Sequence, residues 1–560
     1  MTGKSPAADF RITFGTSGFR GRWGIEYTET TVRATAQGIC DYLADEGLSG
    51  ASIVVGYDSR LHADVAARWA TEVCLGNGFR IHLAERDTPT PALAYYATIA
   101  LHDEAVAAII NCTASHNPVE WHGIKFSPGS GEIAPPAATD AVTDFANQHL
   151  QSGEALAATN LDEAIAIGRV QPFDPRLGYC QWLLDAGLSD ARIPIDISAI
   201  ARFFTTKRRV VVDEMHGAGR GYLPWILDRI GVLYKLLHGT KDPLLGGLHA
   251  ANPEEPHIDL LKSTVLAQEA IIGVGLDTDA DRYGVVTSDG VYFWPNQVLN
   301  LLTYSLGVDR GLTGRLSMSF VSTHLVDDIA ADIAGNEQNK PLPGSLPTHM
   351  RADDYQSYVG DPSALTPKHS FYVPTGLKNL VLVPQMDRDY QILKPRPERW
   401  MDNALVAGEE AAGLTTRGHI PDKDGIWAHL LLLDMMARYR SSLDEIWADV
   451  ASQYWRPRFD RVFVPASPKA ATALITTYLN SFAGAQPGAK SFAGCPVLYL
   501  GGIPGKYAEF RLADETGSDN NFLHIRPSGT EPLIRIYLET SSDQALSALR
   551  DQIIKDAAGI

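Results

Sequence analysis

The fold is decided by an alternation that begins at ASIVVGYD (residues 51–58), an apolar run that stops at a polar turn. HADVAARWATEVCLGNG (62–78) follows with helical spacing and ends in glycine. RIHLAE (80–85), TPALAYYATIALHD (90–103) and AVAAII (105–110) then have the patterns of a strand, a helix and a strand. Strands that alternate with helices are typical of βαβ units, so the sequence predicts an α/β domain with a mostly parallel sheet.

The same alternation returns around RRVVVDEMHGAG (208–219) and around RLSMSF (315–320), whereas the last block mixes helices and strands as an α+β domain does. Residues 335–370, rich in proline and polar side chains, are predicted to be an inserted surface loop. We therefore predict α/β domains at 1–170, 171–300 and 301–445 and a smaller α+β domain at 446–560.

The composition is that of an ordinary globular protein, with 45% apolar and 20% charged residues among 560. A net charge of −18 argues against broad binding to nucleic acid or to an anionic membrane surface. The five cysteines are scattered without a CxxC pair, so we predict free thiols in the cytoplasm. Cys112 is interpreted as a small buried residue rather than a nucleophile. No apolar leader and no stretch long enough to span a bilayer is apparent.

AAIINCTASHNPVEW (107–121) is an apolar strand that ends in small polar residues around Ser115 and His116. In open parallel sheets, ligands bind beyond the carboxyl ends of the strands, so Ser115 is a candidate site residue. The alternative is a plain strand-end turn, with Asn117 restricted by the following proline and His116 hydrogen-bonded within the loop.

GVGLDTDADRYGVV (273–286) carries Asp277, Asp279 and Asp281 directly after a predicted strand, followed by Arg282. Three such carboxylates repel one another unless a cation lies among them, and oxygen ligands alone suit Mg²⁺. An EF-hand is excluded, because the sixth position is not glycine and the twelfth is not glutamate. The alternative is a solvated acidic turn.

HIRPSGTEPLIRIYLE (524–539) supplies the features of a phosphate-binding loop. Its glycine lets backbone N–H groups approach an anion closely, and an arginine can bind phosphate through two hydrogen bonds. The alternative is an ordinary Pro-Ser-Gly turn between strands. The candidate anion-binding residues are Arg526, Ser528, Gly529, Thr530 and Arg535.

Six stretches, in order, resemble the signatures of the α-D-phosphohexomutase superfamily, and most closely those of its phosphoglucomutase branch. They are FGTSGFRG (14–21), TASHNP (113–118) with HGIK ending at Lys125, DTDADR (277–282), VPTGLK (373–378), GEEAAG (408–413) and RPSGTEP (526–532). The resemblance implies four domains around a central cleft, three of them related mixed α/β units and the last of another fold.

The resemblance also implies a chemistry. A phosphoryl group moves between C1 and C6 of a sugar phosphate through phospho-Ser115 and a bound sugar 1,6-bisphosphate. Mg²⁺ is held by the three aspartates and one oxygen of phospho-Ser115, and Arg20 and Lys125 stabilise the transferred group. The general acid/base is left open among His116, Lys125 and Lys378. The residues implied for binding the substrate are Arg282, Thr375, Gly376, Glu409, Glu410, Arg526, Ser528, Gly529, Thr530 and Arg535.

One position departs from the pattern, because the sugar loop commonly carries serine where this chain has Ala411. GEEAAG followed by DKDG (422–425) still resembles the glucose-phosphate branch. The expected activity is therefore interconversion of glucose 1-phosphate and glucose 6-phosphate, by a monomer or a homodimer. The alternatives are a mutase for mannose or a pentose phosphate, a sugar-bisphosphate synthase, or a non-enzymatic protein that binds sugar phosphates.

Overall fold

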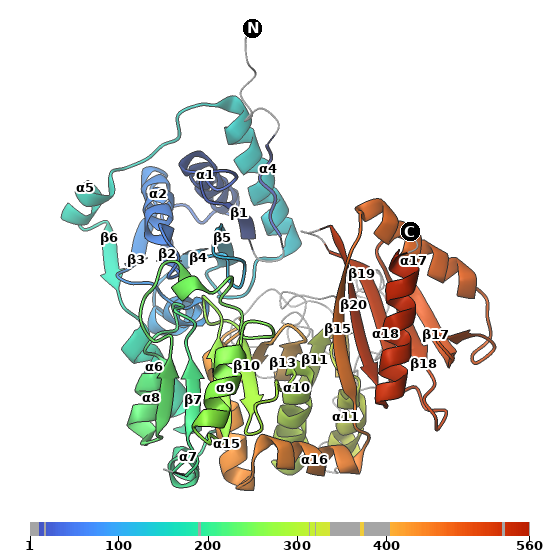
Figure 1. The fold of residues 1–560 in the computed structure, drawn as a ribbon. Helices are drawn as coiled ribbons and strands as arrows, with labels where there is room; N and C mark the ends of the chain where they lie inside the picture. Colours follow the sequence, from blue (N-terminus) through green and yellow to red (C-terminus); the bar gives the residue numbers. More distant parts are fainter. Residues whose placement is uncertain are drawn as a thin grey trace. The chain divides into compact units, whose positions relative to one another are not determined.

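The structure, a computed structural model, describes residues 10–15, 18–188, 192–205, 207–312, 314–319, 321–335, 370–373, 404–528 and 532–558. It divides into two compact units. Figure 1 draws their helices and strands, coloured along the sequence. The first comprises Met1–Phe293, Gly376–Asp387 and Ile392–Asp444, and the second comprises Trp294–Thr375, Arg388–Gln391 and Glu445–Ile560. Residues 336–369 of the predicted insertion lie outside the described residues.

The first unit begins with a six-stranded sheet in the order β1-β5-β4-β2-β3-β6. Its strands are β1 (Gly18–Arg22), β2 (Ser52–Tyr57), β3 (Arg80–Ala84), β4 (Val106–Cys112), β5 (Trp121–Pro128) and β6 (Val170–Phe173). β2, β3, β4 and β6 run parallel, as predicted, whereas at one edge β5 pairs antiparallel with β4 and β1 pairs antiparallel with β5. The short β4–β5 connection accounts for this difference, because a parallel pair needs a much longer crossover.

Helices cover this sheet because its central strands are apolar on both faces. Ile53 and Val55 of β2 join a core with α1 (Glu29–Asp45), α2 (Ala63–Gly76) and α4 (Pro136–Ser152). Val54 points the other way, into a cluster with α3 (Thr90–Tyr95). The single helix predicted over 90–103 is in fact α3 followed by a π-helical turn at Tyr96–Ala100, a difference that hydrophobic spacing does not reveal.

A second sheet of the first unit has the order β10-β9-β7-β8, in which β7 runs parallel to β8 and β9. β9 and β10 form an antiparallel pair whose connection contains the three aspartates. β13 and β14 pair antiparallel as a hairpin. The bounds are β7 (Val210–Asp213), β8 (Tyr234–Leu237), β9 (Ile272–Leu276), β10 (Tyr283–Thr287), β13 (Ala404–Glu409), β14 (Gly413–Thr416), α5 (Leu161–Ala166), α6 (Arg176–Leu184), α7 (Ile197–Phe203), α8 (Leu223–Ile230), α9 (Asp259–Ala267) and α15 (Gly425–Tyr439).

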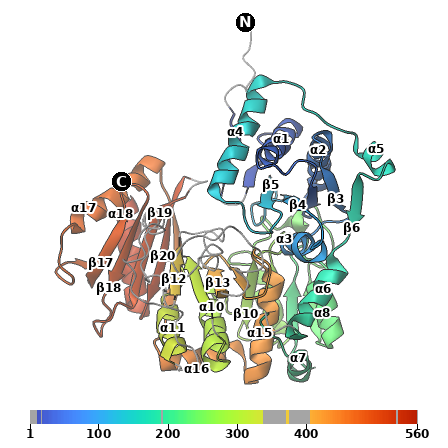
Figure 2. The same cartoon turned by 180° about the vertical axis from the view of Figure 1, so that it is seen from behind.

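The second unit contains a six-stranded antiparallel sheet in the order β15-β20-β19-β18-β17-β16 (Figure 2). Alternate apolar residues, such as Ile534 and Ile536, pack against α17 (Pro468–Phe482) and α18 (Asp543–Ala558). The predicted α+β character of the C-terminal region is therefore confirmed. The other elements are α10 (Pro295–Thr303), β11 (Arg315–Ser319), α11 (Leu325–Gly335), β12 (Ser370–Val373), β15 (Arg458–Pro465), β16 (Ser491–Phe492), β17 (Cys495–Ile503), β18 (Tyr507–Leu512), β19 (Asn521–Pro527) and β20 (Leu533–Thr540), with α16 at Leu443–Gln453.

All five cysteines are free thiols, as predicted. Cys112 is buried at the end of β4, which confirms its interpretation as a small core residue. Across the part of the chain that the structure describes, no helix is both long enough and apolar enough to cross a bilayer.

Glu539 of β20 is a buried carboxyl group on the sheet face opposite α17 and α18. It accepts hydrogen bonds from Thr323 Oγ1 at 2.7 Å and from the backbone N–H of His324 at 2.8 Å. Burial nevertheless raises its pKa from 4.5 to about 7. The native state therefore binds this proton more tightly than the unfolded chain does, and the resulting stability, present below pH 4.5, is lost as the pH rises through about 7.

We expect Glu539→Gln to remove this part of the pH dependence, because glutamine stays neutral. Between about pH 5 and about pH 8, the wild-type unit should lose roughly 2–3 kcal/mol more unfolding free energy than the variant. Thermal unfolding of both proteins across this range checks the prediction. Parallel stability profiles for the two proteins would contradict it.

Candidate active site

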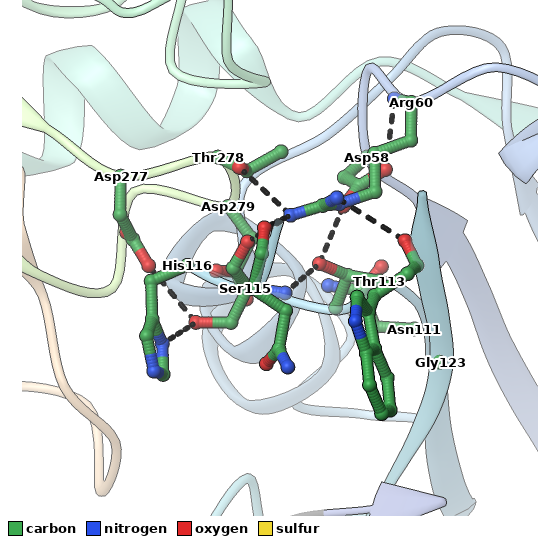
Figure 3. Close-up of polar contacts among 12 residues, drawn as sticks. Asp58, Arg60, Asn111, Thr113, Ser115, His116, Gly123, Asp277, Thr278 and Asp279 are labelled. Atoms are coloured by element: carbon green, nitrogen blue, oxygen red, sulfur yellow. Dashed lines mark hydrogen bonds and ion pairs between the residues drawn. The ribbon is translucent and has the colours of Figure 1, made fainter. Parts of the chain in front are cut away.

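Ser115 lies in the loop that follows β4, with its side chain buried. Its φ of 52° lies in the left-handed region, which is unfavourable for a residue other than glycine. The Ser115 N–H donates to Thr113 Oγ1 at 2.9 Å, and Thr113 Oγ1 donates to Asp58 Oδ2 at 2.6 Å (Figure 3). Asp58 follows β2, the parallel neighbour of β4, so adjacent strand ends support the loop.

The Ser115 side chain faces the acidic loop that follows β9. Ser115 Oγ donates to Asp277 Oδ2 at 2.9 Å and lies 3.3 Å from His116 Nδ1 (Figure 3). Ser115 and the aspartates come from the ends of strands in two different sheets. The structure thus brings together two features that the sequence placed at separate strand ends.

Asp277, Asp279 and Asp281 are all buried, and each offers one oxygen within 4.8 Å of the others. Lys125 Nζ donates to the Oδ2 atoms of Asp279 and Asp281, at 2.6 and 2.8 Å. The Oδ1 atoms of the same two aspartates are buried with no hydrogen-bond partner among the described residues. A cation fits this arrangement, because it would bind the buried oxygens that the protein itself leaves unsatisfied.

The electrostatics of the three carboxylates agree with a cation site. Burial, together with the charges of Asp281 and Asp279, raises the pKa of Asp277 well above its usual value. Burial acts in the same direction on Asp281, but Lys125 and Lys423 outweigh it and hold its pKa well below the usual value. A bound cation would favour the charged form of Asp277 and Asp281.

Cationic and imidazole side chains surround Ser115. Arg20, on β1, donates to the side chain of Asn117. Desolvation, followed by the charge of Arg282, lowers the pKa of Arg20 to about 10, so the guanidinium is still charged at neutral pH. Desolvation, with Arg282 and Arg20, lowers the pKa of His116 well below its usual value, so its imidazole is neutral. The Arg282 backbone N–H donates to Asp277 Oδ1 at 3.0 Å.

The hairpin of β13 and β14 carries the predicted sugar-recognition residues Glu409 and Glu410. The turn that follows Glu409 holds Ala412 at a φ of 62°. Lys423 Nζ lies 3.6 Å from Glu409 Oε1 and 3.4 Å from Asp281 Oδ2, so it links the hairpin to the acidic loop. Lys423 was not predicted to be a site residue, although it lies in the DKDG stretch (422–425).

Asp58 and Arg60 are two further residues that sequence reasoning missed. Their side chains are fully buried, and Arg60 Nε lies 3.2 Å from Asp58 Oδ2. The available signal was the polar turn that ends ASIVVGYD at the carboxyl edge of the sheet.

The remaining predicted residues fall into two groups. In the second unit, Arg526 on β19 pairs in register with Arg535 on β20, and Arg526 Nη2 donates to Tyr537 Oη at 2.8 Å. Ser528 directly follows β19. Thr375, Gly376, Lys378, Gly529 and Thr530 lie outside the described residues.

Family models match the chain in four consecutive regions. The phosphoglucomutase/phosphomannomutase alpha/beta/alpha domains I, II and III match residues 11–152, 195–290 and 371–454, and the C-terminal domain of the same family matches 503–556.

Individual relatives agree with this assignment. The chain is 24% identical to a phosphoglucomutase of Komagataeibacter xylinus, over 98% of this chain and 93% of the relative. It is 25% identical to a phosphoglucosamine mutase of Pseudomonas syringae pv. syringae, over 97% and 98%. A solved structure of parafusin, a phosphoglucomutase from Paramecium in an open form, has the same fold, with a TM-score of 0.72, 19% identity and coverage of 98% and 96%. The chain therefore belongs to the phosphoglucomutase/phosphomannomutase family of the α-D-phosphohexomutase superfamily.

Proposed function

We propose that this protein interconverts glucose 1-phosphate and glucose 6-phosphate by transferring a phosphoryl group through Ser115. The observation that supports this most directly is the position of Ser115 Oγ, buried and 2.9 Å from Asp277 among three carboxylates and several cations. Phosphoryl transfer depends on positioning and charge neutralisation, and this cluster offers both.

The relay begins with phospho-Ser115. Its O–P bond breaks as a sugar hydroxyl forms a new bond to phosphorus, which gives a sugar 1,6-bisphosphate and a free Ser115 hydroxyl. The intermediate reorients within the site, and its other phosphoryl group is transferred to the Ser115 hydroxyl. Mg²⁺ bound by Asp277, Asp279 and Asp281 would supply positive charge next to the transferred group.

The acceptor hydroxyl must give up its proton during transfer. Asp279 and Asp281 outweigh burial and raise the pKa of Lys125, so Lys125 serves as a fixed cation rather than a base. His116 is neutral and adjacent to Ser115 Oγ, so it is the better proton acceptor of the two. Arg20 and Lys125 stabilise the transferred phosphoryl group. In the same scheme, Lys378 assists from the first sugar loop.

Binding of the sugar phosphate uses the residues that the family resemblance implies. Glu409 and Glu410 hydrogen-bond the sugar hydroxyls, while Thr375, Gly376 and Arg282 complete the sugar site. The phosphate group that is not being transferred binds to Arg526, Ser528, Gly529, Thr530 and Arg535. Turnover takes place in the cytoplasm.

The test is the rate of conversion of glucose 1-phosphate, measured with Mg²⁺ and a trace of glucose 1,6-bisphosphate. Mannose 1-phosphate and ribose 1-phosphate serve as rival substrates in parallel assays. We expect glucose to react fastest. If a rival sugar reacts faster, phosphoryl transfer through Ser115 stands and that sugar replaces glucose as the proposed substrate. If a Ser115-phosphorylated protein turns over none of the sugars, the result favours a bisphosphate synthase or a binding protein.

Ala411 lies in the turn between Glu409 and Gly413. The sugar loop that this stretch resembles commonly has serine at this position. We expect Ala411→Ser to raise kcat/KM for glucose 1-phosphate about 2- to 10-fold, because one additional hydrogen bond contributes about 0.5–1.5 kcal/mol. Steady-state kinetics on all three sugars check this expectation. Ala411→Gly, which changes size without adding a hydroxyl, is the control, and an equal gain in that variant would contradict the prediction.

A further inference from the structure

The guanidinium of Arg60 lies beneath the loop that carries Ser115, with its side chain fully buried. Its charge is balanced by Asp58, which accepts from Arg60 Nε at 3.2 Å and from the Arg60 backbone N–H at 2.9 Å. A buried charge is costly unless it is paired and its remaining hydrogen bonds are satisfied. The hydrogen bonds made by the other N–H groups of the guanidinium therefore indicate the structural role of Arg60.

Four backbone carbonyl groups converge on Arg60, three from the Ser115 loop and one from the first residue of β5. Nη2 donates to the carbonyl oxygens of Ser115 and Asn117, both at 2.6 Å. Nη1 donates to those of Pro118 at 2.8 Å and Trp121 at 3.1 Å. A planar guanidinium can serve so many acceptors at fixed angles, whereas a lysine ammonium offers three donors from a single point.

These contacts bear directly on the unusual backbone of Ser115. A left-handed residue other than glycine costs about 1–3 kcal/mol and persists only where its surroundings fix it. The Ser115 carbonyl is held by Arg60, and the Ser115 N–H is held by Thr113, whose hydroxyl donates to Asp58. Both sides of Ser115 are thus anchored through Asp58 and Arg60 (Figure 3).

Arg60 also reaches the acidic loop. Its Nη2 lies 3.4 Å from Thr278 Oγ1, and Thr278 stands between Asp277 and Asp279 in the chain (Figure 3). One side chain therefore contacts both the loop that carries the serine and the loop that carries the carboxylates.

We propose that Arg60 is a positioning residue that sets the distance between Ser115 Oγ and the aspartate cluster. None of the hydrogen bonds that the structure gives Arg60 involves Ser115 Oγ, and it acts through the loop backbone. This proposal rests on the proposed relay through Ser115. Displacing a reacting group by about 1 Å can cost about 100-fold in rate, so loss of these contacts should appear in kcat.

The test compares Arg60→Lys with the wild-type enzyme, on the sugar that the wild type converts fastest. We expect kcat to fall about 100-fold while KM changes by less than about 3-fold, because the sugar-binding residues are untouched. Hydrogen exchange should accelerate at residues 113–121 and remain unchanged in α2. Arg192→Lys is the matched control, because it also removes a buried guanidinium, one that donates to the Trp182 carbonyl and, among the described residues, makes no hydrogen bond to either loop.

Either of two results of this comparison would overturn the proposal. One is unchanged kcat with unchanged exchange in the loop, and the other is faster exchange throughout the first sheet, which would mark Arg60 as a general structural residue. Asp58→Asn provides a second variant should Arg60→Lys fail to fold, with the same kcat-specific loss expected. The rate of phosphoryl transfer from glucose 1,6-bisphosphate to Ser115, followed by the mass of the intact protein, measures how well Ser115 is positioned. This assay applies even if the wild-type protein is not a mutase. A variant rate equal to that of the wild type in this assay would also refute the proposal.

Discussion

Replacing Ser115 with alanine is expected to lower kcat about 10⁶-fold, the scale of loss that follows deletion of a nucleophile. The reason is that Ser115 Oγ is the only atom of this side chain that can carry the phosphoryl group between the two half-reactions. The mass increment of a phosphate, gained by wild-type protein from glucose 1,6-bisphosphate, should be absent in Ser115→Ala. Steady-state kinetics and intact mass measure the two effects.

Ser52→Ala is the matched control for this substitution. It also removes a buried serine hydroxyl, which donates to Glu104. Ser52 lies at the start of β2, at the end of the strand away from Asp58. Near-normal activity is expected for the control. Turnover by Ser115→Ala within about 100-fold of the wild-type rate would show that the phosphoryl group does not pass through Ser115.

Replacing Asp279 with asparagine is expected to lower the affinity for Mg²⁺ at least about 100-fold. Loss of a residue that only hydrogen-bonds to a metal ligand usually lowers the affinity less. Asp279 Oδ1 is one of the two oxygens of the aspartate cluster that are buried without a hydrogen-bond partner among the described residues, and the substitution also removes charge beside Lys125. Mg²⁺ at about 100 times its Kd should raise the unfolding free energy of the wild-type protein by about 2.7 kcal/mol. Under the same conditions the variant should gain less than half of that.

Thermal unfolding with and without Mg²⁺ measures this difference independently of turnover. Asp259→Asn, which neutralises an exposed carboxylate at the start of α9, is the control and should be stabilised as the wild type is. An equal Mg²⁺-dependent shift in Asp279→Asn would mean that the ion binds elsewhere.

Hydrophobic spacing predicted the parts of the site that lie at strand ends. Ser115 follows β4 and Asp277 follows β9, and both strands are apolar runs that stop abruptly in polar residues. The two strands belong to different sheets, so periodicity alone could not predict the 2.9 Å contact between these residues. The resemblance to a known family supplied that connection.

Other parts of the site leave no pattern in the sequence. Arg60 binds carbonyl oxygens, which every residue has, so nothing in the loop composition indicates its partners. Lys423 approaches Asp281 through tertiary packing of segments far apart in the chain. The antiparallel edge formed by β1 and β5 was missed for a different reason, because strand direction depends on connection length rather than on apolar spacing.

The pairing of β2 with β4 also restricts how the length of this chain can change during evolution. Tyr57 lies opposite Cys112, and this register brings Asp58 beside the loop of Ser115. Inserting or deleting one residue in either strand would turn every following side chain to the opposite face of the sheet and separate Asp58 from Thr113. We therefore expect homologous chains to keep the lengths of these two strands and to gain or lose residues in surface connections, such as the turn between α1 and β2.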